Sequence, residues 1–451
     1  MSLSIPVYII NLEKRKDRRS YIENEFYCRS EFDIHIIKAI ESSIPAVGLY
    51  KSLHYVISVA KQQELPYVLV CEDDHQFTSE YHVDILNGYL ERMAKYDADV
   101  FAGGVSWFNC ALQAEKDLYW IDRFTGAQFL VIYARFYQKI LESTFTELDI
   151  IDNWISNLSD KVFVAVPMLS VQHDFGYSDV TDKNNVVGRV EKLFSDTMER
   201  WKALQNVNDH VQNSITTHYP HDDIGYDMNL PTYIIKQPHS DRIAHINEQF
   251  KDKMELDVSF VEMKSGNNQE SALWETIHVV IKSAMEKEDD VILICQDHHL
   301  FSDRYKKEEL LEAIYEGAYL GADLILGGIN EVQQIIPVSK NLCWISLFKG
   351  AQFTIIYSAF FDTILAASLY DGDLVDSKLS SLSANKYVIH PFISLGEDFK
   401  LADTKIDESA SSEQLFEFER CESTILKVRE ISRYLSDMNQ VMQQGEGTNN
   451  R

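Results

Sequence analysis

The chain of 451 residues repeats itself, and this internal duplication sets the frame for its fold. Residues 119–141 and residues 343–365 are identical at 12 of 23 positions, at a constant offset of 224 residues. The same offset relates the acidic segment that ends at Tyr81 to the segment that ends at Tyr305. Because a constant offset between separate segments is the signature of repeated structural units, we expect two tandem copies of one domain.

The duplication and the composition together predict two globular domains. A chain of this length exceeds one ordinary hydrophobic core, and hydrophobic residues make up 45% of it. The segment between the copies is polar and rich in Asn, His and Asp, as linkers are. We therefore expect a first domain, a linker, a second domain, and a C-terminal helix with a disordered tail, at residues 1–205, 206–229, 230–405 and 406–451.

Strands and helices alternate along each copy. Apolar runs rich in β-branched residues are separated by segments with helical spacing, such as Leu49, Leu53, Val56, Ile57 and Ala60. This alternation predicts an α/β fold, in which each copy has a mostly parallel sheet with helices on both faces. Ligands of such sheets bind at the carboxyl ends of the strands.

Charge and cysteine usage exclude several classes of partner and compartment. The net charge of -28 repels nucleic acid and anionic membranes at long range. The six cysteines are scattered without a CxxC pair, which is typical of a reduced, cytoplasmic protein. Residues 1–19 contain no apolar core of the kind that signal peptides have, and the sequence has no apolar run near 18 residues, so we expect no signal peptide and at most peripheral contact with a membrane.

The acidic motif, which we define as Glu72, Asp73 and Asp74, directly follows an apolar strand-like run. Three carboxylates at the end of a buried strand are costly unless a positive charge neutralises them. Mg²⁺ or Mn²⁺ with oxygen ligands is suited to this, and it could bridge the phosphates of a nucleotide diphosphate leaving group. A solvated loop is the alternative, because such triplets are common in acidic proteins.

Several segments of the first copy, in this order and spacing, resemble glycosyltransferase family 25. That family includes lipooligosaccharide β-galactosyltransferases and collagen-modifying galactosyltransferases. The matching segments are Ile10-Asn11-Leu12 with the basic run to Arg19, the acidic motif, Gly126-Ala127-Gln128-Phe129, Asp149 or Asp152, and Pro167 to Gln172-His173. A further family segment is blurred to Gly48, Ser52 and His54, without its tryptophan. The resemblance spans nearly all of the first copy.

The resemblance implies a GT-A-like fold and an inverting transfer of a hexose, with galactose as the family default, from a UDP-sugar. The implied acceptor is a glycan, a lipooligosaccharide or a peptide, and the implied cofactor is Mn²⁺ or Mg²⁺. The implied metal ligands are Asp74, Glu72 and His173. The implied donor-binding residues are Asn11, Arg15, Arg18, Glu41, Glu72 and Asp73. Arg18 as a plain salt-bridge partner, and His173 as an ordinary surface histidine, are the alternatives.

An inverting transfer also needs a general base that deprotonates the acceptor hydroxyl. Asp152 is the first candidate, followed by Asp122 and Asp149. Asp149 and Asp152 recur in the second copy as Asp373 and Asp376, so a structural role at the start of a helix is the alternative.

The second copy lacks the residues that would carry this chemistry. Glu72 is replaced by Gln296, and Asp74 by His298. Because a hard cation needs negative oxygen ligands, we expect a degenerate domain that binds acceptor or braces the first copy. The histidines of this segment leave a softer metal such as Zn²⁺ as an alternative there.

Two other functions compete with the transferase for the chain as a whole. One is a non-catalytic protein that binds carbohydrate or nucleotide sugar. The other is a metal-dependent hydrolase or nucleotidyltransferase, which the absence of a glycine-rich phosphate loop makes less favoured.

Overall fold

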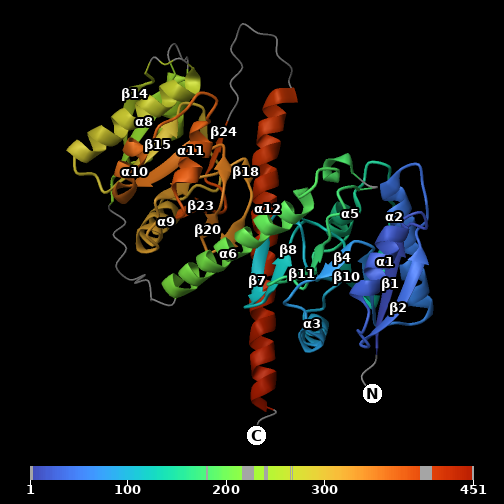
Figure 1. Cartoon of the computed structure of the whole chain (residues 1–451). Helices are drawn as coiled ribbons and strands as arrows, with labels where there is room; N and C mark the ends of the chain where they lie inside the picture. The colour runs from blue at the N-terminus through green and yellow to red at the C-terminus, as the bar shows by residue number, and fades with distance from the viewer. Residues whose placement is uncertain are drawn as a thin grey trace. The chain divides into compact units, whose positions relative to one another are not determined.

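The computed structural model describes residues 4–178, 181–215, 228–237, 242–264, 266, 268–396 and 409–448. The chain forms two compact units, which are Met1–Asn208 with Tyr434–Arg451, and Asp209–Arg433. Each unit is an α/β structure, and in Figure 1 the sheet of the first is coloured blue to green and that of the second yellow to orange, while the C-terminal helix is red.

The first unit contains the strands β1 (Ile5–Asn11), β2 (Phe32–Lys38), β3 (Tyr67–Glu72), β4 (His75–Phe77), β5 (Val100–Ala102), β6 (Trp107–Phe108), β7 (Ala111–Glu115), β8 (Leu118–Ile121), β9 (Phe124–Thr125), β10 (Phe129–Tyr133), β11 (Val162–Ala165) and β12 (Ser170–Gln172). Its helices are α1 (Lys16–Glu25), α2 (Pro45–Gln62), α3 (Val83–Lys95), α4 (Ala134–Glu142), α5 (Ile151–Leu158), the 3-10 helix η1 (Asp182–Asn184) and most of α6 (Arg189–Ile215).

The main sheet of the first unit has eight strands in the order β2-β1-β3-β10-β5-β11-β8-β7. Only β8 and β10 run against the direction of the other strands in this sheet. β1 and β3 are almost wholly buried apolar runs, as expected for inner strands with both faces covered. They pair in parallel, with Ile9 opposite Cys71, so Asn11 and Glu72 end at the same edge of the sheet.

The second unit contains the strands β13 (Leu230–Lys236), β14 (Leu256–Glu262), β15 (Val291–Gln296), β16 (His299–Phe301), β17 (Leu324–Leu326), β18 (Glu331–Val332), β19 (Ile335–Pro337), β20 (Leu342–Ile345), β21 (Phe348–Lys349), β22 (Phe353–Tyr357), β23 (Lys386–Ile389) and β24 (Ser394–Gly396). Its helices are α7 (Ile243–Phe250), α8 (Gln269–Glu286), α9 (Lys307–Tyr319), the 3-10 helix η3 (Ser358–Phe360), α10 (Phe361–Ala366), α11 (Val375–Leu382) and the first part of α12 (Ser409–Thr448).

The main sheet of the second unit has the order β14-β13-β15-β22-β17-β23-β20-β19. Position for position, this is the strand order of the first sheet, and the pairings have the same directions. The predicted α/β class, with a mostly parallel sheet in each of two units, is therefore confirmed.

Two helices extend beyond the boundaries expected from the sequence. α6 continues to Ile215, so the first part of the segment predicted as a linker is helical. Val211 explains this, because it continues the apolar face of the helix and is buried. α12 continues to Thr448, into the segment predicted as a disordered tail, and its residues from Tyr434 onward belong to the first unit. Residues 216–227 and 449–451 lie outside the described part.

The cysteines form no disulfides, and the described helices are not suited to span a membrane. All six cysteines are free, and five of them are buried, where a thiol packs as a small apolar group. Among the helices of the described residues, none combines the length and the apolar character needed to cross a membrane.

Candidate active site

The acidic motif lies where the fold predicts a ligand site, at the carboxyl end of β3. Glu72 is the last residue of β3, and Asp73 and Asp74 form the turn that leads into β4. Asn11, at the end of the neighbouring strand β1, donates a hydrogen bond from Nδ2 to Asp73 Oδ2 at 2.7 Å. The parallel pairing of β1 and β3 therefore brings together two residues that are 62 positions apart.

Arg18, on the first turn of α1, is the cation that faces this motif. Its Nη1 lies 3.0 Å from Asp73 Oδ1 and 2.9 Å from Asp74 Oδ2. The side chains of Arg18 and Asp73 are each 10% exposed and that of Asp74 is 14% exposed, so these ion pairs are largely shielded from water. Buried charges are tolerated in proteins when they are paired in this way.

Tyr177 holds Arg18 from the other side. Arg18 Nε donates to Tyr177 Oη at 3.3 Å, and Nη2 donates to the Tyr177 carbonyl at 3.0 Å. The guanidinium also lies over the rings of Phe175 and Tyr177, 4.9 and 4.8 Å from their centroids. All three nitrogens of the guanidinium are thus engaged, and Tyr177 is a site residue that the sequence reasoning missed.

The motif retains more negative charge than Arg18 compensates. Asp74 Oδ1 is buried and has no hydrogen-bond partner. Burial raises the pKa of Asp74 to about 6, against the opposing influence of Arg18. Burial, followed by the charges of Asp74 and Asp152, raises the pKa of Glu72 well above its ordinary value. These two carboxyl groups therefore take up a proton more readily than usual, and Asp74 Oδ1 can accept a hydrogen bond or a positive charge.

Asp152, the first candidate for the general base, lies close enough to Glu72 for their charges to interact. It sits in the first turn of α5, and its Oδ2 accepts a hydrogen bond from the backbone N–H of Gly126 at 2.9 Å. Gly126 has a φ of +104°, and a Cβ there would lie 2.9 Å from Ser106 N, so only glycine fits this turn. Burial raises the pKa of Asp152 to about 6, which suits a base that works near neutral pH.

The other two candidates for the base have local structural contacts. Asp149 Oδ2 accepts hydrogen bonds from the backbone N–H and the Oγ1 of Thr146, which lower its pKa and stabilise the turn before α5. Asp122, which is 8% exposed, follows β8 and accepts a hydrogen bond from Asn109 Nδ2 at 3.3 Å. Its Oδ2 also lies 3.7 Å from Arg123 Nε.

Of the remaining predicted residues, His173 contacts the motif directly, Arg15 contacts Tyr177, and no contact joins Glu41 to the motif among the described residues. The backbone N–H of His173 donates to the carbonyl of Asp74 at 2.8 Å, and the imidazole stacks on Tyr21 with ring centroids 4.5 Å apart. The guanidinium of Arg15 lies 4.1 Å from the centroid of the Tyr177 ring. Glu41 is exposed in the segment between β2 and α2.

The described residues offer part of a metal site. Among them, no group of three His, Cys, Asp or Glu side chains is arranged to hold an ion, so Glu72, Asp74 and His173 do not form a closed cage. Asp74 Oδ1 is buried without a partner, and Glu72 lies within its electrostatic reach. Mg²⁺ in nucleotide enzymes typically binds through one or two carboxylates plus the substrate phosphates, and these residues fit that mode.

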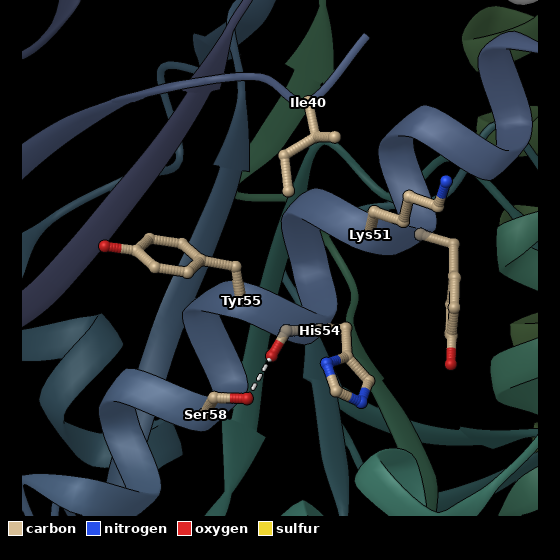
Figure 2. Close-up of a pocket in the computed structure, with 6 residues that line it drawn as sticks. Ile40, Lys51, His54, Tyr55 and Ser58 are labelled. Carbon is tan, nitrogen blue, oxygen red and sulfur yellow. Dashed lines mark hydrogen bonds between the residues drawn. The ribbon is translucent and has the colours of Figure 1, made fainter. Parts of the chain in front are cut away.

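A separate shallow hollow of about 500 Å³ lies on the outer face of α2. Figure 2 shows its lining residues, which are Ile40, Tyr50, Lys51, His54, Tyr55 and Ser58. None of them belongs to the acidic motif. Ser52, from the blurred family segment, instead accepts a hydrogen bond from Ile40 N at 2.8 Å and donates one to the Gly48 carbonyl at 2.9 Å, which is a structural role.

The second unit keeps several of these contacts, including the hydrogen bond from Gly350 N–H to Asp376 that corresponds to that of Gly126 and Asp152, and it lacks the second carboxylate. Arg242 Nη1 lies 3.1 Å from Asp297 Oδ1, which matches the pair of Arg18 and Asp73. His298 occupies the position of Asp74. Because the first ion pair recurs, we attribute it to the fold, whereas the second carboxylate is particular to the first unit. Glu397, the counterpart of His173, lies outside the described residues.

His75 is a further residue that the motif analysis passed over. It is fully buried, its Nδ1 lies 2.7 Å from Ser170 Oγ, and burial lowers its pKa to about 3. His299 and Ser394 repeat this contact at 2.8 Å in the second unit. Because the contact recurs, we assign a structural role to this pair of residues. The identity of both residues in the two copies of the sequence is the signal that could have identified this role.

No protein-family model and no curated protein matches this chain. Solved structures with some similarity include A197 from STIV, at 13% identity and a TM-score of 0.27, covering 38% of this chain and 86% of that chain. Apo UDP-glucose pyrophosphorylase matches at 8% identity and a TM-score of 0.25, covering 44% and 82%. Its complex with UDP-glucose matches at 9% and 0.26, covering 44% and 81%. Similarity at this level supports no conclusion about activity.

Proposed function

We propose that the first unit is an inverting hexosyltransferase that moves a sugar, with galactose favoured, from a UDP-sugar to a glycan, lipooligosaccharide or peptide acceptor. The observation that supports this is that the carboxylate of Asp152 lies within electrostatic reach of Glu72, which ends β3 at the same edge of the sheet as the end of β1. Such an edge is where α/β sheets bind ligands, and a carboxylate with a raised pKa is what a general base near neutral pH requires.

In the proposed reaction, Asp152 accepts the proton of the acceptor hydroxyl. The acceptor oxygen bonds to the anomeric carbon while the bond from that carbon to the diphosphate oxygen breaks, and UDP leaves with the electron pair. Gly126 N–H holds Asp152 Oδ2 and so orients the carboxylate. Glu72 and Asp74 would hold Mn²⁺ or Mg²⁺, which supplies charge stabilisation to the diphosphate leaving group.

The same proposal assigns a role to each unit and a cellular location to the enzyme. The donor and the acceptor meet at the first unit, and the second unit, with Gln296 and His298 in the motif, binds acceptor or braces the first. We place the enzyme in the cytoplasm, where a membrane-borne acceptor would be reached peripherally.

We expect one UDP-sugar to raise the melting temperature of the protein only when Mn²⁺ is present. A ligand at a hundred times its dissociation constant stabilises the folded state by about 2.7 kcal/mol. Asp74→Asn should abolish this shift, because it removes a negative ligand from the motif. Differential scanning fluorimetry with a panel of nucleotide sugars measures it.

The matched control is His298→Asn at the corresponding position of the second unit, which should leave the shift intact. If no nucleotide sugar shifts the wild type with any metal, the transferase proposal is wrong and a carbohydrate-binding role is favoured instead. Release of pyrophosphate in place of UDP would indicate a nucleotidyltransferase.

The pH dependence of transfer should report Asp152. The base form of Asp152 predominates above its pKa of about 6, and the pKa of Asp74 is also raised to about 6, so kcat/KM should fall at least about tenfold per pH unit below that value. The stability of the fold should change in the opposite direction. Because the pKa of Asp152 is raised from 3.8 to about 6 in the folded state, the protonated carboxyl stabilises the fold, and this stabilisation is lost as the pH rises from 3.8 towards 6. A pH–rate profile with a flat acid limb down to pH 5 would contradict this role.

A further inference from the structure

We infer that Arg18 is a built-in counter-ion that keeps a bare divalent cation out of the acidic motif, so that the site accepts a cation only together with a diphosphate. The second clause rests on the proposed function. The exclusion of a bare cation rests on the contacts of Arg18 alone.

The contacts show that Arg18 pairs with Asp73 and Asp74, two of the three carboxylates of the acidic motif. Asp73 uses Oδ2 for Asn11 and Oδ1 for Arg18, at 2.7 and 3.0 Å. Asp74 uses Oδ2 for Arg18 at 2.9 Å. Between these two residues, only Asp74 Oδ1 has no partner. A hard cation that prefers six oxygen ligands would therefore find one unbonded oxygen in this pair, directly beside a positive charge.

Arg18 is also unable to move aside without losing other contacts. Tyr177 accepts hydrogen bonds from Nε and Nη2 of Arg18, and it donates a further bond to Asp17 Oδ2 at 2.6 Å. These hydrogen bonds of Tyr177 hold the guanidinium of Arg18 in its position against the acidic motif. A diphosphate changes this balance, because it brings additional oxygen ligands and two negative charges that offset the charge of Arg18.

The second unit provides an internal comparison. Arg242 pairs with Asp297 at 3.1 Å, and the next residue is His298 in place of an aspartate. There the arginine faces one carboxylate of the motif, whereas in the first unit Arg18 faces two. Removing Arg242 therefore exposes less negative charge than removing Arg18, which makes it a matched control.

Titration with Mn²⁺ in the absence of nucleotide, followed by the electron paramagnetic resonance signal of the free ion, tests the inference on the full chain. We expect Arg18→Gln to bind Mn²⁺ at least about tenfold more tightly than the wild type, because two carboxylates lose their counter-ion. Arg18→Gln with Asp74→Asn should lose this gain, and Arg242→Gln should behave as the wild type. Comparison between variants removes the contribution of the acidic surface.

Arg18→Lys separates the effect of charge from an effect on folding, and circular dichroism checks each variant. Because lysine keeps a positive charge, this variant should bind Mn²⁺ as weakly as the wild type. The inference is overturned if the wild type binds bare Mn²⁺ as tightly as Arg18→Gln, or if Arg18→Lys gains affinity. If Arg18→Gln binds Mn²⁺ more tightly but added UDP does not increase Mn²⁺ binding to the wild type, the counter-ion role of Arg18 is supported and the assignment of a UDP-sugar donor is wrong.

Discussion

Asp152→Asn should reduce kcat for hexose transfer by about 10²- to 10⁴-fold, the usual contribution of a general base. Asparagine keeps a side-chain oxygen that can accept the hydrogen bond from Gly126 N–H, so the turn at Gly126 should persist. The substitution therefore removes the ability to take up a proton while retaining the structural contact. Steady-state kinetics with release of UDP as the readout should show the loss in kcat with little change in KM.

The second unit supplies the control for this experiment. Asp376 Oδ2 accepts hydrogen bonds from the backbone N–H groups of Gly350 and Ala351, at 2.7 and 3.2 Å. Asp376→Asn should leave transfer unchanged while perturbing the same kind of turn. Equal losses in both variants would mean that the aspartate is structural in each unit. An active Asp152→Asn variant would return the search for the base to Asp122.

The architecture was predictable because it depends on patterns that repeat along the chain. The constant offset between the copies predicted two like units, and the two sheets have the same strand order. The alternation of apolar strands with helical segments predicted the α/β class. Parallel pairing places the ends of β1 and β3 at one edge of the sheet, which is why the sequence alone predicts the position of the acidic motif in the fold.

The contacts within the site depend on distances that sequence patterns do not encode. Arg18 lies 56 residues from Asp74 and 159 from Tyr177, and their meeting depends on the path of the segment after β12. The choice between Asp149 and Asp152 depends on where α5 begins. Because the helix starts at Ile151, Asp152 reaches Gly126, whereas Asp149 folds back on Thr146.

The duplication nevertheless contained more information than motif matching extracted. Residues that recur in both copies, such as His75 with His299, proved to have the same buried contacts in each unit. Positions that differ, such as Asp74 and His298, distinguish the two sites. Arg18 belongs to both groups, because its pair with Asp73 recurs and its pair with Asp74 does not.

Arg18→Ala should destabilise the first unit by about 3–5 kcal/mol, the usual cost of leaving buried charges without their partner. Asp73 and Asp74 would both lose their cation, and neither side chain is more than 14% exposed. Urea unfolding, followed by hydrogen exchange of the β3 and β4 amides to isolate the first unit, measures this loss. Adding Asp74→Asn to Arg18→Ala should recover part of it, because one of the two uncompensated charges is then absent.

Arg242→Ala is the matched control for this loss of unfolding free energy. Arg242 faces Asp297, which is 2% exposed, where Arg18 faces two aspartates, so removal of Arg242 leaves one buried carboxylate of the motif uncompensated in place of two and should cost less. A loss below about 1 kcal/mol for Arg18→Ala would be that of an ordinary surface ion pair, and would contradict the buried pairing of Arg18. Mn²⁺ should restore the lost free energy of unfolding in Arg18→Ala but not in Arg242→Ala. This result would show that Asp73 and Asp74, which need Arg18 for stability, are the carboxylates that accept a cation when Arg18 is absent.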